Sequence, residues 1–395
     1  MSSIYQLLQR MRGPRVKALG AEASDHDHDH DYYEEIAYDT MDMTCVAFGY
    51  SSGVVLGDGR VVFVPTYATT IYIFNPAMNA LSRVGSVADI GSTADKYNGG
   101  VLLPDGRVVF VPSKATTIGI FDPTTNAYIT IAGMPGNYAY AGGVLLPDGR
   151  VVFVPFNATT IGIFNPATNA YSTIGGMPGG AAYFGGVLLP DGRVVFVPFS
   201  ATTIGIFNPT TNAYSTIAGP PGGFAYYGGV LLSDGRVVFV PRHATTVGIF
   251  DPATNAYSTI AGMPGGGAYF GGVLLPDGRI VFVPANAETI GIFNPATNAY
   301  STIAGPPNTF AYRCGVLLND GRVLLIPHAA ATIGILTVSD EKARRRAHSR
   351  TEAVKAELVA AVWHPKRMSR WCLDEDERRE MAEMGLCDAT ATATA

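Results

Sequence analysis

GGVLLPDGRVVFVPFNATTIGIFNPATNAYSTIGGMPGG, residues 142–180, is one of seven near-copies of a segment that fill most of this 395-residue chain. The Asp-Gly pair recurs at Asp58, Asp105, Asp148, Asp191, Asp234, Asp277 and Asp320, with one interval of 47 residues and then five of 43. A period in the forties is typical of repeat proteins in which each copy forms one supersecondary unit stacked on its neighbours. The repeat therefore decides the architecture of residues 37–338.

One copy contains four apolar runs separated by turn residues. Pro147-Asp148-Gly149 combines a fixed φ, a turn-capping carboxylate and a residue that accepts positive φ, which predicts a tight hairpin. A second turn begins at Asn165-Pro166. The strands predicted between these turns are 144–146, 150–154, 160–164 and 170–174.

Four short antiparallel strands in each copy predict one blade of a β-propeller. VVFV and IGIF are apolar on both faces, as expected of a sheet packed between two other sheets. The paired glycines Gly142 and Gly143 suit a crowded centre where backbones approach closely. We therefore predict an all-β fold, a seven-bladed propeller of four-stranded antiparallel blades.

The seventh copy stops after its third strand, and the start of the chain supplies the missing one. In the later copies the Ala-Tyr that opens the preceding fourth strand lies 21 residues before the Asp of the Asp-Gly turn, as from Ala256 to Asp277. Ala37 lies the same distance before Asp58. The sequence therefore predicts that residues 37–41 form the outer strand of the last blade and close the ring.

The order of parts resembles the kelch repeat over about 300 residues. Phe164-Asn165-Pro166 stands where kelch units carry Tyr-Asp-Pro, and Tyr171 stands in the place of their Trp. Two features depart from kelch: Pro155 replaces the double glycine at the end of the second strand, and the period is slightly short. The resemblance implies a kelch-like propeller, and the WD40 signature is missing.

Charge separates the repeats from the chain ends. The formal net charge of −5 provides no basic field for nucleic acid. Charged residues become dense from Ser339 onward, which indicates a boundary near residue 338. The spacing of Val354, Leu358, Ala361 and Val362 predicts a helical segment over 339–388, and the low-complexity end predicts a disordered tail over 389–395. Before the propeller we expect a flexible arm over 1–36. Within the helical segment, residues 361–377 resemble a short His-Pro…Trp motif of large DNA virus proteins, which implies a viral origin as one hypothesis.

Cellular location is predicted from cysteines and hydropathy. The four cysteines show no CxxC pair, which favours a reduced, intracellular setting in the cytoplasm. No apolar run approaches the roughly 18 residues of a membrane span, and no apolar signal segment begins the chain. We expect no membrane association and no cofactor.

The copies differ mainly at one rim of the predicted propeller. The loops between strands two and three, and those between blades, share one face, and their residues vary from copy to copy. One interpretation is a recognition surface for a protein partner, and the other is drift at exposed positions. The candidate partner-binding residues are Tyr67, Lys114, Asn157, Ser200, Arg242, His243, Asn286, Arg313 and His328.

Three further groups of residues carry candidate chemistry. His243 and His328, with Glu288 on the blade between them, are the candidates for a polar catalytic cluster, but nothing in the sequence brings them together. In the Asp/His run, His26, His28 and His30 would lie on one side of an extended chain and could bind Zn²⁺, Ni²⁺ or Cu²⁺. The alternative for this run is a solvated acidic linker that binds divalent metal opportunistically. Arg344–Arg346 form a basic cluster that a solvated helix face explains better than nucleic-acid binding.

Three functions follow from this pattern. The leading hypothesis is a non-enzymatic interaction scaffold, with a structural role in a virus particle as a specific form of it. A second is a multivalent lectin that binds glycans through equivalent sites on the copies. A propeller enzyme is the third hypothesis, and the absence of an assembled catalytic cluster in the sequence speaks against it.

Overall fold

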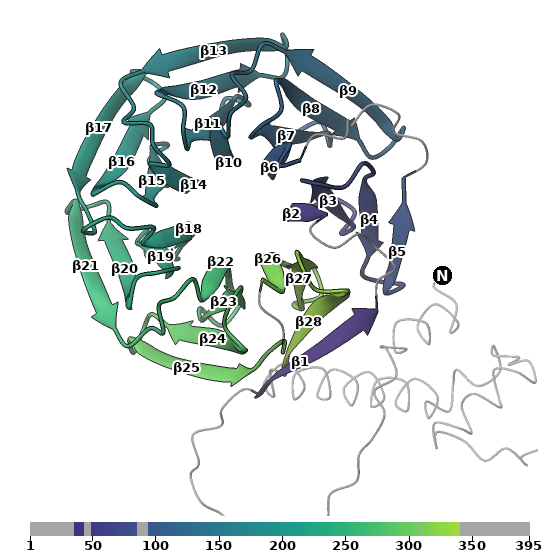
Figure 1. The fold of residues 1–395 in the computed structure, drawn as a ribbon, viewed down its shortest axis with the longest axis vertical. Helices are drawn as coiled ribbons and strands as arrows, with labels where there is room; N and C mark the ends of the chain where they lie inside the picture. The colour runs from purple at the N-terminus through teal and green to yellow at the C-terminus, as the bar shows by residue number, and fades with distance from the viewer. Residues whose placement is uncertain (1–34, 43–48, 85–93, 308–309, 340–395) are drawn as a thin grey trace, which may run out of the picture. The chain divides into compact units, whose positions relative to one another are not determined.

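The computed structural model describes residues 35–42, 49–84, 94–307 and 310–339 of the chain. One compact unit spans Ile36–Val338. Within it, seven four-stranded sheets follow one another as the blades of a ring, and the innermost strands surround its centre (Figure 1). The predicted all-β, seven-bladed propeller is therefore confirmed.

Each blade contains four strands in the order of the sequence, except the last. The innermost strands are β2 (Tyr50–Val55), β6 (Tyr97–Leu102), β10 (Tyr140–Leu145), β14 (Tyr183–Leu188), β18 (Tyr226–Leu231), β22 (Tyr269–Leu274) and β26 (Tyr312–Leu317). The second strands are β3 (Val61–Pro65), β7 (Val108–Pro112), β11 (Val151–Pro155), β15 (Val194–Pro198), β19 (Val237–Pro241), β23 (Ile280–Pro284) and β27 (Val323–Pro327). We number the blades from the one that starts with β2, so blade 7 starts with β26.

The outer half of each blade repeats in the same way. The third strands are β4 (Tyr72–Asn75), β8 (Thr117–Asp122), β12 (Thr160–Asn165), β16 (Thr203–Asn208), β20 (Thr246–Asp251), β24 (Thr289–Asn294) and β28 (Thr332–Ser339). The outermost strands are β5 (Ala80–Arg83), β9 (Ala127–Ala132), β13 (Ala170–Gly175), β17 (Ala213–Ala218), β21 (Ala256–Ala261), β25 (Ala299–Ala304) and, in blade 7, β1 (Glu35–Asp42).

The innermost strand begins earlier than the sequence predicts. In blade 3 it starts at Tyr140, which lies opposite Pro155, rather than at Val144. The register then shifts between Tyr140 and Gly143, and Gly142 has a φ of 98°. This glycine lets the chain form an irregular pairing that extends the strand, which a pattern of apolar residues alone does not reveal.

The core lies between adjacent blades. The second strand is fully buried in every blade, as Val152 and Phe153 illustrate with 0% exposure. At the centre, a Cβ added to Gly142 would lie 3.1 Å from the Cα of Gly185 in the next blade. The crowded centre predicted from the glycine pair is therefore present, and a larger side chain at Gly142 would push the two innermost strands apart.

A pair of tyrosines joins the inner and outer strands of most blades. The hydroxyls of Tyr97 and Tyr128 lie 2.6 Å apart, and those of Tyr183 and Tyr214 are at the same distance. In blade 7 the hydroxyl of Tyr38 takes the outer place and lies 2.8 Å from that of Tyr312. The first strand of the chain thus reproduces the side-chain contact of a genuine fourth strand.

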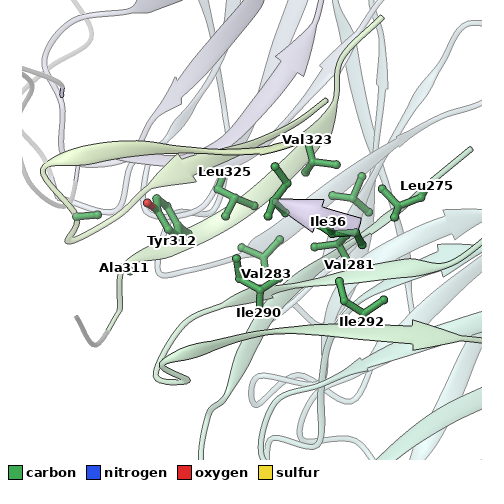
Figure 2. Close-up of a cluster of buried hydrophobic side chains, with 13 residues drawn as sticks. Ile36, Leu275, Val281, Val283, Ile290, Ile292, Ala311, Tyr312, Val323 and Leu325 are labelled. Carbon is green, nitrogen blue, oxygen red and sulfur yellow. The ribbon is translucent and has the colours of Figure 1, made fainter. Parts of the chain in front are cut away.

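β1 closes the ring, as the sequence predicts. It pairs with β28, and the two lie side by side although they come from opposite ends of the propeller sequence (Figure 1). Ile36 of β1 is 8% exposed and packs in a cluster that includes Val283 of blade 6 and Leu325 of blade 7 (Figure 2). The closing strand therefore contributes to the core between blades and not only to the edge of one sheet.

The predictions for the chain ends lie outside the described residues, except that residues 35 and 36 belong to β1 and residue 339 to β28 rather than to the predicted arm and helical segment. These are the flexible arm, the helical segment over 339–388, the disordered tail, the basic cluster and the Asp/His run with His26, His28 and His30. Among the described residues, no helix is long and apolar enough to pass through a bilayer.

Candidate functional site

The ring has two faces, and residues vary more between the copies on one face than on the other. Because the strands alternate in direction, the Asp-Gly-Arg hairpins and the turns after the third strands share one face, which we call the DGR face. The loops between second and third strands, and those between blades, share the other, which we call the variable face. The candidate partner-binding residues all lie on or just inside the variable face.

Side chains of the DGR face repeat because they hold the blades together. Each arginine pairs with the aspartate two residues before it, as Arg150 Nη2 does with Asp148 at 2.7 Å. Several of these arginines also donate a hydrogen bond to a proline carbonyl in the next blade. These bonds join Arg107 to Pro166 (3.4 Å), Arg150 to Pro209 (3.3 Å), Arg193 to Pro252 (3.2 Å) and Arg322 to Pro76 (2.8 Å). The repetition of this face has a structural explanation.

On the variable face, the same backbone positions carry different side chains. The residue after the first tyrosine of each innermost strand is Ser51, Asn98, Ala141, Phe184, Tyr227, Phe270 and Arg313 in turn. The residue after the last proline of each second strand is Thr66, Ser113, Phe156, Phe199, Arg242, Ala285 and His328. Paired register between these tyrosines and prolines places the two positions next to each other in every blade.

Blades 3 to 6 place an aromatic cluster at these positions. Phe199, Tyr227 and Phe270 are 5%, 5% and 8% exposed, and Phe156 and Phe184 pack against them. The rings of Phe184 and Tyr227 are stacked with centroids 3.6 Å apart. Adjacent blades therefore combine single substitutions into one continuous group of packed rings, which we call the aromatic cluster.

Arg242 lies over the aromatic cluster. Its guanidinium carbon is 5.1 Å from the ring centre of Phe199, 5.3 Å from that of Tyr227 and 4.8 Å from that of Phe270. Cation–π attraction of this kind stabilises a guanidinium over a ring. The Nε of Arg242 is buried and makes no hydrogen bond within the described residues.

Arg313 of blade 7 approaches the same place from the other side. Its Nε donates a hydrogen bond to the hydroxyl of Tyr227 at 3.3 Å, so Tyr227 contacts both arginines. Burial, together with the positive charge of Arg313, lowers the pKa of Arg242. In the described part of the chain, neither arginine forms an ion pair with a carboxylate.

A polar cluster occupies the opposite side of the variable face. Lys114 Nζ lies 3.2 Å from Asp95 Oδ2, and the hydroxyl of Tyr138 donates to the same oxygen at 2.9 Å. Burial opposes ionisation of Asp95, but hydrogen bonds from Tyr67, Tyr138 and Lys114 outweigh it and lower the pKa of this carboxyl. Asp95 is therefore a charged group already held by its neighbours.

Lys96 occupies a position that is Ala or Gly in the other blades. It is 2% exposed, and burial lowers the pKa of its amine although Asp95 raises it. The buried charge on the loop into blade 2 has no counterpart in the other copies. Lysine at this position distinguishes the polar side from the aromatic side.

The predicted catalytic trio is not assembled. The structure gives Glu288 no contact with His243 or His328 among the residues it describes, and Glu288 is exposed. Burial and the charge of Arg242 lower the pKa of His243, while burial and Arg313 lower that of His328 to about 4. Both imidazoles are therefore neutral at pH 7, and the described residues include no group of His, Cys, Asp or Glu suited to a metal ion.

The other candidate residues have local structural roles. Asn157 Nδ2 donates to the carbonyl of Asn137 at 3.1 Å, and its Oδ1 accepts from the amide of Ala181 at 2.9 Å. Asn286 Nδ2 donates to the carbonyl of Gly266 at 3.3 Å. Ser200 is half-buried, and Tyr67 belongs to the polar cluster through Asp95. Asn157 and Asn286 thus hold the inter-blade loops.

Sequence reasoning missed three members of the aromatic cluster. Phe184, Tyr227 and Phe270 follow the repeated tyrosine, at a position that the predicted strand boundaries placed outside the innermost strand. The signal was available, because this position carries six different residue types across the seven copies while the tyrosine before it repeats. Comparing every column of the repeat, and not only the loops, would have found it.

Comparison with solved structures identifies proteins that share this fold. A catalytically inactive virginiamycin B lyase from Staphylococcus aureus, solved with quinupristin, is 16% identical, with a TM-score of 0.67 over 77% of this chain and 100% of that one. A streptogramin B lyase gives 16% identity and a TM-score of 0.65, covering 77% of this chain and 98% of that one. The extracellular domain of a two-component system from Bacteroides thetaiotaomicron gives 10% identity and a TM-score of 0.61, covering 77% of this chain and 40% of that one.

These similarities establish the propeller fold and nothing finer. No protein-family model matches the chain, and the comparison with curated proteins found no significant match. The solved structures include enzymes, so the expectation that the protein has no enzymatic activity receives no support from them.

Proposed function

We propose that the protein is an interaction scaffold that binds a protein partner through its variable face. The observation that carries this proposal is the contrast between the two faces. Repeated residues of the DGR face are explained by hydrogen bonds within and between blades, whereas exposed residues of the variable face, such as Tyr67 and His243, differ at equivalent backbone positions. Drift alone would alter both faces alike, whereas the exposed residue after the turn proline of the DGR face changes only between alanine and threonine, as at Ala167 and Thr210.

The proposal is tested by placing the same charge on each face. Ser200→Glu with His243→Glu alters the variable face, and Thr168→Glu with Thr211→Glu alters exposed positions of the DGR face. We expect the first pair to abolish capture of one stoichiometric protein from the native source, and the second pair to retain it. Equal capture by both double variants, at equal thermal stability, would show that the variable face is not the binding surface.

A propeller enzyme is the second candidate, because two of the solved structures compared are lyases. Asp95, Lys96 and His328 would be its polar groups, since the charge of Asp95 acts on both other side chains. Incubation with quinupristin, followed by mass spectrometry of the product, separates the candidates. The scaffold proposal expects no turnover, and turnover lost in Lys96→Met would replace it with the enzyme.

The remaining expectations from the sequence form part of the same proposal. A kelch-like repeat family, an intracellular location and a structural role in a virus particle are compatible with a scaffold, and each stays a prediction. A lectin would need similar sugar sites on several blades, whereas the aromatic cluster and the polar cluster each occur once. Glycan-array binding by the full chain would favour the lectin.

A further inference from the structure

Arg242 is a half-buried cation that forms no ion pair with a carboxylate among the described residues. Its guanidinium carbon lies within 5.3 Å of the ring centres of three aromatic side chains, its Nε lacks a hydrogen-bond partner, and no described carboxylate pairs with it. Removing a charge from water costs free energy that a partner normally offsets. A half-buried arginine whose charge has no carboxylate partner among the described residues therefore marks a place where an external anion would be stabilised.

A second cation reinforces the positive potential at the same place. The positive charge of Arg313 lowers the pKa of Arg242. Tyr227 contacts both arginines, because its hydroxyl accepts a hydrogen bond from Arg313 and its ring lies under Arg242. Repulsion between like charges costs stability. An anion near both guanidinium groups would be attracted to each, and this attraction would offset the repulsion between them. The positive charge of Arg242 also lowers the pKa of His243 in the same loop of blade 5, and that of Arg313 lowers the pKa of His328 in blade 7.

Two exposed aromatic rings contact the rings over which Arg242 lies. Phe224 is 48% exposed and its ring centre lies 4.9 Å from that of Phe199, while Phe310 is 42% exposed and lies 6.1 Å from Phe270. Both phenylalanines have positive φ, 59° and 55°, at the equivalent position of their inter-blade loops. Large apolar side chains held exposed in a strained backbone conformation offer flat surfaces beside the charged group.

We propose that this place is a binding site for a small aromatic carboxylate, and we call it the Arg242 site. The fork of a guanidinium matches the two oxygens of a carboxylate, and the guanidinium carbon of Arg242 already lies near the ring centres of Phe199 and Phe270. Because its Nε is buried, the two Nη groups are the donors for the ligand. The planar body of the ligand packs against Phe224 or Phe310. The site goes beyond the proposed partner-binding function, because it needs no protein partner.

The test is calorimetry of the full chain at pH 7.5 with 2-naphthoate, its neutral amide 2-naphthamide, and inorganic phosphate. We expect 2-naphthoate to bind at least about tenfold more tightly than either of the others, since only it supplies both the charge and the ring. Equal affinity for 2-naphthamide would refute the role of the arginines. Equal affinity for phosphate would refute the role of the aromatic rings, and the absence of binding at millimolar 2-naphthoate would refute the site.

Variants assign the binding to these side chains. Arg242→Gln is expected to weaken 2-naphthoate binding about tenfold or more, and Phe310→Ala, an exposed change that folding tolerates better, about threefold or more. Arg193→Gln, which removes the same charge from the DGR face, should leave the affinity unchanged. If Phe310→Ala and Arg193→Gln behave alike, the Arg242 site is wrong. Because no protein partner is present, this result is independent of the capture experiment.

Discussion

At the residue scale, blade 1 shows how one substitution compensates another. Blades 2 to 7 have glycine in the middle of the third strand, and in blade 2 a Cβ on Gly119 would lie 2.9 Å from the hydroxyl of Tyr128. In blade 1 the glycine is replaced by Tyr72, and the outer tyrosine is replaced by Leu81. The ring of Tyr72 lies 6.0 Å from that of Tyr50, so it fills space that an outer tyrosine fills elsewhere.

We therefore predict that Gly119→Tyr and Tyr128→Leu are coupled. Gly119→Tyr alone should lower the free energy of unfolding by about 1–3 kcal/mol through overpacking. Tyr128→Leu alone should cost about 1–3 kcal/mol, because the hydroxyl of Tyr97 loses the shorter of its two hydrogen bonds and keeps only Thr117 Oγ1 at 3.3 Å. The double variant, measured by urea denaturation, should cost at least about 1 kcal/mol less than the sum. Additive effects within about 0.5 kcal/mol would show that the exchange in blade 1 is not compensation.

Residue identity alone could not predict the candidate site. Asn157 and Asn286 were selected because they vary, yet both hold loop backbone through hydrogen bonds. Tyr227 and Phe270 were overlooked, although they form the base on which Arg242 rests. The contacts depend on which blades are neighbours and on how far each side chain reaches across the face, and neither is encoded in one copy of the repeat.

At the element scale, local signals were sufficient for most strands. The predicted third strand 160–164 is observed as Thr160–Asn165, and the predicted fourth strand 170–174 as Ala170–Gly175. Proline, glycine and asparagine turns set these boundaries through short-range geometry. The innermost strand was predicted too short because its first half depends on two features. One is the positive φ of Gly142, and the other is the pairing of Tyr140 with Pro155 on the second strand, which local sequence does not reveal.

The closing strand provides the prediction at this scale. Removing residues 1–43 deletes β1, exposes the edge of β28, and removes Ile36 and Tyr38 from the core between blades. Loss of a buried isoleucine alone costs about 2–5 kcal/mol, so we expect the free energy of unfolding to fall by at least about 3 kcal/mol. Removal of residues 1–30, which keeps β1, is the matched control. A thermal melt of the 1–43 deletion that matches the control would contradict closure by β1.

At the scale of the whole molecule, two kinds of contact close the ring: a strand pairing and side-chain hydrogen bonds between blades 7 and 1. β1 completes the last sheet, and Arg322 of blade 7 reaches blade 1, donating to the carbonyl of Pro76 and to Oδ1 of Asn79, each at 2.8 Å. Each blade otherwise depends on its neighbours, so a ring without closure would have two exposed ends. Closure is what converts seven nearest-neighbour interfaces into one cooperative unit.

Arg322 and Arg60 allow this role to be measured, because they occupy the same position in different blades. Both pair with the aspartate two residues earlier, but Arg322 also reaches the neighbouring blade and its side chain is 20% exposed, against 35% for Arg60. An exposed ion pair contributes little, so Arg60→Ala should cost below about 1 kcal/mol. Arg322→Ala should cost about 1–2 kcal/mol more, because it removes charge-assisted hydrogen bonds between blades 7 and 1. Guanidinium chloride unfolding at high salt measures the difference with the surface ion pairs screened. Equal losses in the two variants would mean that β1 closes the ring without help from the DGR face.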